Sequence, residues 1–454
     1  MKILKTLYIV MLMMALGCNE QLDLEPISVI GENGYFNNAK EVEAALIGAY
    51  DGLQQTVQRE IFILENRSDN GRVGSGSGGD FLAVTTFDDK AISSVITAYW
   101  TSVYNAISRA NVVLKYVDVV EDDNLRNQIE GEARFIRAYL YFRLVRMFGE
   151  VPLVLETVNP EETAVLAKVP VNDVYQAIIE DLMFAANNLP ATSTEKRAAG
   201  LPAKGILAKV HLTRQDFSLA KPLLEDIINS GSYALENSYS DVFDLGNELN
   251  DEMLFVIQFK SGSNGEGNNF SYELTPESPI GAVRPTDNLI NAYNPSDQRK
   301  DVSLSETDKL ILKYKNNNIL YDGDNDWPVL RYADIVLMYG EVLNEQSKST
   351  GPTQLAIDYL NLTRERAGLP ILTKAEMDTY EAYKSAMLKE RRLELAFENQ
   401  RWFDLLRTDT ALEVMRAIGA NDGFEVEPYR LFFPIPQRDI DTSGGILKQN
   451  AGYQ

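Results

Sequence analysis

Apolar residues recur at three- and four-residue steps through much of the chain, which predicts a largely helical protein. In residues 173–189 the apolar positions form a single stripe, and Pro190 ends it. Residues 129–148 are apolar around most of the helix circumference, as expected for a buried helix, and Gly149 ends that pattern.

Several of these segments read as paired helices. Residues 203–228 predict two short helices around a turn at 214–216, with small residues at Ala208 and Ala220 where paired helices must approach closely. A looser copy runs from 340 to 356, and a third would join 132–148 to 173–189 across an insertion. The pattern resembles degenerate tetratricopeptide repeats. We therefore predict an all-α dominated fold, in which imperfect tetratricopeptide-like helical repeats accompany a loop-rich irregular region and a few short strands, the strands near 253–259 and 309–314.

Three segments have the composition of long loops: residues 66–80, 261–270 and 315–328 are rich in Gly, Ser, Asn and Asp. Long irregular segments within a compact protein are usually binding loops or disordered. We therefore expect ligand contacts to come from these loops, while the helices hold mostly packing residues.

Two of the loops contain side chains suited to sugars. A sugar presents an apolar C–H face and polar hydroxyls, so proteins bind it with a flat aromatic ring beside Asp, Asn or Arg. Asp69, Asn70 and Arg72 lie in the first loop, and Tyr321 and Trp327 bracket the third. These five residues are the predicted ligand-binding set, and alanine at either aromatic position is expected to weaken binding with little effect on thermal stability.

The third loop also has the start of a calcium-binding pattern. Asp322, Asp324 and Asp326 have the spacing of the first three ligands of an EF-hand. Trp327 and Ala333 occupy the positions where that loop needs Gly and Glu. The pattern therefore excludes a standard EF-hand. We predict a protein without cofactors, and a calcium ion at a less regular site formed by these aspartates is the alternative.

Catalytic and zinc motifs are not supported. His211, the only histidine, falls at a packing position of a predicted helix, and no G-x-S-x-G motif accompanies it. No further His or suitable Cys could complete a zinc site. Carboxylates are numerous, but no two stand out as a glycosidase pair. We predict no catalytic residues and no metal site.

The N-terminus has the pattern of a bacterial lipoprotein leader. Lys2 and Lys5 precede an apolar stretch too short to span a bilayer, which ends at Gly17 and Cys18. Cys18 is the only cysteine, so no internal disulfide can form. Residues 1–17 are predicted to be a signal peptide, and Cys18 the lipid-anchor site that holds the remaining chain to a membrane.

Charge narrows the possible partners. The chain carries 43 basic and 66 acidic residues, a net charge of −23. No basic patch in the sequence offsets this excess, so nucleic acid is excluded as a partner.

The strongest family signal lies in residues 390–407, ERRLELAFENQRWFDLLR, which resemble the signature helix of the SusD/RagB family. We expect one continuous amphipathic helix over 388–407, in which Arg391 meets Glu394 and Arg401 meets Glu398. Five further blocks resemble the family in the same order along the chain: 132–154, 181–190, 327–345, 362–370 and 431–453.

The resemblance implies a nutrient-binding lipoprotein of the outer membrane, exposed at the cell surface, that passes an oligosaccharide or peptide to a SusC-like TonB-dependent transporter. It implies one body over 18–454, whose halves (about 18–230 and about 231–454) pack as a unit. Residues 55–98 and 231–325 match the family less well, so ligand specificity is expected there.

Two alternatives from other classes stay open. One is a surface glycoside hydrolase that uses two loop carboxylates, and the other is a helical-repeat scaffold without a small ligand. The hydrolase would be identified by a pair of acidic residues whose loss abolishes turnover without loss of binding. A glycan-binding screen would separate the scaffold, which binds no glycan, from a glycan-binding protein.

Overall fold

The computed structural model describes residues 36–74, 78–159, 163–262, 265–274, 281–316 and 320–453. Helices predominate and the strands are short, so the predicted fold class is confirmed. No helix within these residues has the length and apolar content needed to cross a bilayer. The predicted leader and Cys18 lie outside the described residues.

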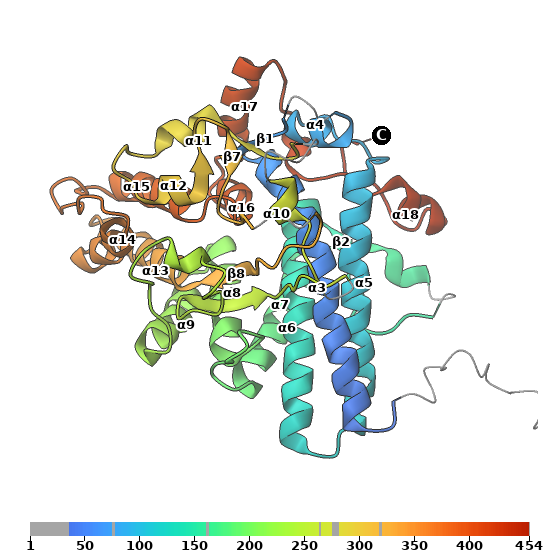
Figure 1. Ribbon diagram of the computed structural model, residues 1–454. Helices are drawn as coiled ribbons and strands as arrows, with labels where there is room; N and C mark the ends of the chain where they lie inside the picture. Colours follow the sequence, from blue (N-terminus) through green and yellow to red (C-terminus); the bar gives the residue numbers. More distant parts are fainter. Residues whose placement is uncertain are drawn as a thin grey trace, which may run out of the picture.

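Three long helices run side by side and form one wall of the molecule (Figure 1). They are α3 (Ala39–Arg67), α5 (Ser94–Tyr116) and α6 (Asp123–Phe148). The segment predicted to be a buried helix forms most of α6, which ends at Gly149 with φ 74°. Such a left-handed backbone suits glycine because it has no Cβ.

Local capping explains where these helices begin. The side chains of Asn38, Ser93 and Asp122 each accept a hydrogen bond from a backbone amide in the first turn. These bonds satisfy amides that have no partner within the helix.

The predicted helix pairs are present. Helix α7 (Val171–Asn188) packs on α6, α8 (Gly200–Thr213) packs on α9 (Phe217–Ser230), and α13 (Tyr332–Gln346) packs on α14 (Gln354–Arg366). Ala208 and Ala220 are fully buried where α8 meets α9. A Cβ at Gly340 would lie 2.5 Å from the Tyr383 hydroxyl oxygen, so that close approach requires glycine.

Short strands join distant segments. Strand β4 (Met253–Ile257) pairs antiparallel with β8 (Trp327–Arg331), which confirms the strand predicted near 253–259. The shorter pairs are β1 (Gly71–Arg72) with β5 (Arg284–Pro285), β2 (Val151–Pro152) with β3 (Lys168–Val169), and β6 (Leu304–Ser305) with β7 (Leu310–Ile311).

The remaining helices are α4 (Asp80–Thr85), α10 (Phe270–Glu273), α11 (Asp287–Ala292), α12 (Arg299–Ser303), α15 (Tyr380–Glu394), α16 (Arg401–Arg407), α17 (Ala411–Asp422), α18 (Gln437–Thr442), and the 3-10 turns Val117–Val119, Thr163–Leu166, Asp241–Phe243 and Pro428–Leu431.

The predicted continuous helix over 388–407 is wrong in its middle. Helix α15 ends at Glu394, a turn follows, and α16 begins at Arg401. Phe397 and Asn399 in the turn have φ values of 64° and 57°, which no α-helix contains.

Tertiary donors explain the break. The carbonyl oxygens of Ala396 and Phe397 accept hydrogen bonds from the Lys313 ammonium (2.6 Å) and the Tyr314 hydroxyl (3.0 Å). The Asn399 amide donates to Glu65 on α3 (2.8 Å). These bonds, from residues far away in sequence, replace those of a continuing helix.

The ion pairs expected within that helix are also wrong. Arg391 binds Asp334 and Asp404, and Arg401 binds Asp69. Each of these partners lies on another element, so Arg391 and Arg401 connect elements and do not stabilise one helix.

A buried charge cluster lies behind this turn, and Arg331 is at its centre. The Arg331 guanidinium is 1% exposed and donates both bonds of a bidentate pair to Glu398, each 2.8 Å long. It also contacts the carboxylates of Glu252 and Glu394, and Arg299 and Arg366 supply further positive charge to Glu394. Burial alone would lower the pKa of Arg331, but the three carboxylates raise it well above its ordinary value.

We expect Arg331→Ala to reduce the free energy of unfolding by about 3–5 kcal/mol, because it leaves buried carboxylates without their shared cation. Chemical denaturation monitored by circular dichroism measures this. The control is Arg126→Ala, which removes an exposed pair with Asp123 and should change stability by no more than about 1 kcal/mol. Equal effects of the two variants would contradict the central role of the cluster.

Candidate functional site

The pairing of β1 with β5 brings two loop segments together. Gly71 lies opposite Pro285 and Arg72 opposite Arg284, and the Gly74 amide donates to the Gly281 carbonyl over 2.8 Å. The first glycine-rich loop therefore lies against a segment more than 200 residues later in the chain. Both segments fall in the two ranges for which ligand specificity was expected.

A pocket of about 520 Å³ opens beside this strand pair, and we call it the β1–β5 groove. Its walls come from β1, β5, α11, the β6–β7 turn and the C-terminal end of α17. The lining is polar and consists of Arg72, Val73, Gly74, Arg284, Pro285, Thr286, Asp287, Asn288, Asp308, Lys309, Ile418, Asn421 and Asp422. A volume within the range of small-ligand sites and a set of hydroxyl-binding side chains suit a short saccharide.

Two arginines define the electrostatics of the groove. Burial lowers the pKa of Arg72, and the ion pair of Arg72 with Asp422 (3.3 Å) partly offsets this effect. Burial also lowers the pKa of Arg284. One terminal nitrogen of each guanidinium, Nη2 of Arg72 and Nη1 of Arg284, is enclosed and finds no hydrogen-bond partner among the described residues. Unpaired enclosed donors are costly, so they favour an added acceptor.

Other charges and amides are arranged around these arginines. The Lys309 ammonium pairs with Asp287 at 2.7 Å. The Asn288 side chain is exposed at the start of α11. Sequence patterns did not indicate these residues, because they have no motif spacing and come together only through the β1–β5 pairing.

Asp69 and Asn70 lie behind the strand and do not line the groove. The Asp69 carboxylate accepts two bonds from Arg401 (2.7 and 2.9 Å), and the Asn70 side-chain oxygen accepts one from Arg392 (2.8 Å). Burial would raise the pKa of Asp69, but the Arg401 hydrogen bond and the charges of Arg392 and Arg401 lower it below its ordinary value. Both side chains are buried, so they hold β1 in place instead of making the predicted ligand contact.

Of the five predicted residues, only Arg72 lines the groove. Its guanidinium donates to the Ser68 and Gly71 carbonyls (2.8 and 2.7 Å). These bonds orient the side chain along the groove wall. The predicted role of Arg72 in ligand binding stays a prediction, now with a defined location.

Trp327 is a core residue, contrary to its predicted role as a stacking surface. Its ring is 2% exposed and stacks on Tyr314, with centroids 5.2 Å apart and planes at 25°. Phe270 contacts its edge at 5.5 Å. The reason is that Trp327 begins β8, pairs with Ile257 and points into the core, although its sequence neighbours are polar.

Tyr321 is exposed and lies away from the groove. Its ring is 48% exposed and meets Tyr272 edge to face at 5.1 Å. The carboxylate of Glu273 raises the pKa of the Tyr321 hydroxyl. The position is accessible to a ligand, so its predicted role remains open.

The three aspartates of the calcium-like spacing each accept a backbone amide of another loop. Asp326, Asp324 and Asp322 accept from the amides of Phe259, Ser261 and Gly262, at 2.8, 2.7 and 2.8 Å respectively. Within the described residues, no group of three or more His, Cys, Asp and Glu side chains is arranged to hold a metal ion. The carboxylates thus hold the loop beginning at residue 259 against the 322–326 segment.

A larger pocket, of about 860 Å³, lies beside these aspartates, between α3 and the 245–249 segment. Exposed Ile47, Leu245 and Leu249 contribute apolar surface to it. Burial raises the pKa of Glu248 to about 8 and that of Asp326 to about 7. The negative charge of Asp326 also raises the pKa of Glu248, whose carboxylate accepts a hydrogen bond from the Asp326 backbone amide. The pocket is acidic, in contrast to the groove, where acidic and basic side chains balance.

Comparison with protein families identifies two matches that together cover most of the chain. The model of the SusD family matches residues 292–453, and the model described as "Starch-binding associating with outer membrane" matches residues 20–212. Among curated proteins, SusD-like protein P2 of Formosa agariphila is 27% identical over an alignment of 514 residues that covers all of both chains. A SusD-like protein of Bacteroides ovatus is 26% identical and covers 74% of this chain and 70% of its own length.

Solved structures share the fold. A laminarin-binding SusD-like protein superposes with a TM-score of 0.80 at 24% identity and covers 92% of this chain and 100% of its own. Surface glycan-binding protein A of Bacteroides thetaiotaomicron, solved in complex with laminarihexaose, has a TM-score of 0.78 at 21% identity and covers 91% of this chain and 99% of its own. At this identity the likeness defines the fold of the present chain.

The burial difference between the two aromatic residues leads to a prediction. Trp327→Ala should lower the free energy of unfolding by about 3–5 kcal/mol, because it leaves a cavity in the core. Tyr321→Ala should change stability by less than about 1 kcal/mol, because the ring is half exposed. Thermal and urea denaturation of both variants measure this, and similar stability of the two would contradict the core assignment of Trp327.

Proposed function

The chain belongs to the SusD family, and from that premise we propose that it is a surface lipoprotein that binds an oligosaccharide and delivers it to a SusC-like TonB-dependent transporter of the outer membrane. The β1–β5 groove is the proposed binding site. Carbohydrate binding is the function that the related proteins with known ligands have in common, since their names include laminarin and laminarihexaose.

The observation that carries this proposal is the convergence of two loop segments that lie more than 200 residues apart in the sequence. Strands β1 and β5 join them at one pocket lined largely by polar side chains, and the β5 segment lies between the ranges that the two family models match. A frame with variable loops is the usual arrangement by which one fold serves several ligands.

The chemistry of the lining suits neutral sugar hydroxyls. The Asn288 amide can donate and accept, the Asp287–Lys309 pair offers both an acceptor and a donor, and Arg284 adds donors. Because a hydroxyl is both donor and acceptor, a mixed set of this kind can satisfy vicinal hydroxyls of one ring.

Each groove carboxylate already has a partner, which favours binding over hydrolysis. Asp287 pairs with Lys309, Asp308 accepts from Ser305, and Asp422 pairs with Arg72. A glycosidase needs two carboxyl groups that face the same glycosidic bond, one of them kept protonated. The scaffold alternative is less favoured because a repeat protein that binds only proteins needs no such polar groove.

The proposed anchor explains how a modest affinity for the transporter would be sufficient. A lipid chain at Cys18 would confine the protein to the membrane surface, where it meets the transporter at high effective concentration. The protein could then cover the transporter most of the time and still open to admit ligand.

Asn288→Ala should weaken oligosaccharide binding by about 0.5–1.5 kcal/mol, because it removes an exposed amide from the groove without disturbing the core. Calorimetric titration of laminarihexaose, and of a glycan panel if that sugar does not bind, gives the affinity. The matched control is Asn188→Ala, an exposed amide at the end of α7. If the two variants bind every ligand of the panel equally well, the site lies elsewhere.

Cys18→Ala should release the protein from the outer-membrane fraction and leave its fold unchanged, because only the anchor is lost. Fractionation of cells followed by immunoblotting measures the release.

Affinity purification of the unmodified protein after gentle detergent extraction should recover a TonB-dependent transporter. Absence of any transporter, under conditions that preserve other membrane complexes, would refute the delivery step and favour the scaffold alternative.

A further inference from the structure

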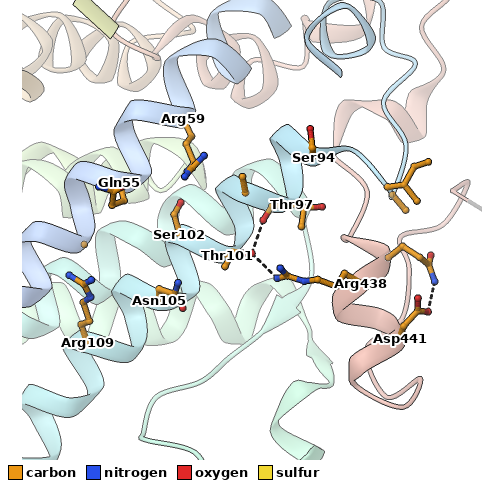
Figure 2. A pocket seen from close by; sticks show the side chains of 15 residues that line it. Gln55, Arg59, Ser94, Thr97, Thr101, Ser102, Asn105, Arg109, Arg438 and Asp441 are labelled. Carbon is orange, nitrogen blue, oxygen red and sulfur yellow. Dashed lines mark hydrogen bonds between the residues drawn. The ribbon is translucent and has the colours of Figure 1, made fainter. Parts of the chain in front are cut away.

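A second polar pocket, of about 760 Å³, lies on the outer face of the helical wall. Helices α3 and α5 form its floor, and α18 with the segment before α5 closes one end (Figure 2). It shares no lining residue with the β1–β5 groove. Part of its lining falls within residues 55–98, one of the two ranges for which ligand specificity was expected.

Three arginines line this pocket, one from each helix: Arg59 from α3, Arg109 from α5 and Arg438 from α18. Asp441 is the only acidic residue in the lining, and it accepts a hydrogen bond from Gln437 (2.7 Å). The chain as a whole has a net charge of −23. The residues that line the pocket thus carry more positive than negative charge, in contrast to the chain as a whole, and Asp51 and Asp439 beside the lining pair with two of the arginines.

The three arginines differ in the hydrogen bonds and ion pairs that they make with other residues of the protein. Arg109 pairs with Asp51 and donates to the Gly48 carbonyl (2.7 Å). Arg438 donates to the Thr101 hydroxyl (2.8 Å) and pairs with Asp439 (3.3 Å). The Arg59 guanidinium has no hydrogen bond or ion pair within the described part of the chain. Figure 2 shows it directed over the pocket, on the side opposite Arg438.

The remaining lining consists mainly of hydroxyl and amide groups, which a bare inorganic anion would not need. These are Gln55, Ser94, Thr97, Thr101, Ser102, Asn105 and Gln437. Gln55 and Asn105 are exposed, and their amide groups, which have no hydrogen-bond partner among the residues that the structure describes, face the same space as Arg59 (Figure 2). Amides beside guanidinium groups match a ligand that carries both hydroxyls and a negative charge, because planar guanidinium groups bind oxyanions in a bidentate manner.

We infer that this pocket is a second saccharide site, which takes an oligosaccharide bearing acidic groups and holds its carboxylate or sulfate between Arg59 and Arg438. The inference rests on the proposed function only in taking the ligand to be a saccharide. The two sites differ in charge, since every charged group that we describe in the β1–β5 groove except Arg284 has an ion-pair or hydrogen-bond partner, whereas the α3–α5 pocket contains the unpaired guanidinium of Arg59 beside two further arginines.

The test compares acidic oligosaccharides with their neutral counterparts on the full protein by calorimetry. The probes are tetragalacturonate, a tetramannuronate and a sulfated galactan tetrasaccharide, each beside its methyl-esterified or desulfated form. At least one acidic probe should bind about tenfold or more tightly than its neutral form, and this advantage should shrink as salt rises. The preference between carboxylate and sulfate probes identifies the acidic group.

Arg59→Gln and Arg438→Gln should each remove most of that advantage and leave binding of the neutral form unchanged. Because Arg59 has no partner to lose, its variant should melt at the temperature of the unmodified protein. Arg126→Gln, at a partly exposed arginine on α6, is the control and should keep the full preference. Asn288→Ala should weaken neutral-glycan binding and spare the acidic preference, so the two sites fail independently.

Three results would overturn the inference: no acidic probe that outbinds its neutral form, an acidic preference that survives both arginine variants, or inorganic sulfate that binds as tightly as the sulfated tetrasaccharide. The last would indicate a site for a bare anion. Loss of neutral-glycan binding in Asn288→Ala with no acidic preference anywhere would uphold the proposed function and reject the second site.

Discussion

The structure depends on a buried cluster of arginines and glutamates that joins segments spread over residues 252–398. Arg331 at the end of β8 contacts Glu252 before β4, Glu394 at the end of α15 and Glu398 in the turn that follows. Arg299 and Arg366 complete the neutralisation of Glu394, whose pKa they hold well below its ordinary value against the effect of burial. Charges enclosed this far are tolerated only with their partners in place, so the cluster specifies one packing of these elements.

The cluster also explains the shape of the region that holds the site. Because α15 ends at Glu394 and the chain turns beside the cluster, the following residues reach α3, and Arg401 binds Asp69 just before β1. Arg392 binds Asn70 from the same side. The position of β1, and with it one wall of the β1–β5 groove, thus follows from ionic contacts made by the family's signature segment. That segment acts at a distance from the ligand, through the strand that it supports.

The helical wall and the loop region have different roles. Long, well-capped helices and fully buried small residues such as Ala208 and Ala220 form a rigid frame. The loops attached to it line a groove of paired charges and an acidic pocket beside Asp326, while helices α3, α5 and α18 line a pocket that contains three arginines. Such a frame lets surface chemistry change without loss of the fold, which is the behaviour expected of a family whose members bind different ligands.

Sequence periodicity by itself determined the helices, their pairing and the β4 strand, because these depend on local apolar spacing, small residues and turns that are adjacent in the chain. Composition and motif order further indicated the family and the loops that would hold the ligand. Only the tertiary structure decided that the signature helix breaks after Glu394, that Trp327 is a core residue, and that Asp69 and Asn70 support β1 while Arg284 and Asn288 line the groove. The physical reason is that burial and hydrogen-bond partners at these positions come from residues up to about 330 positions away, as in the contact of Arg401 with Asp69, and no local pattern records such partners.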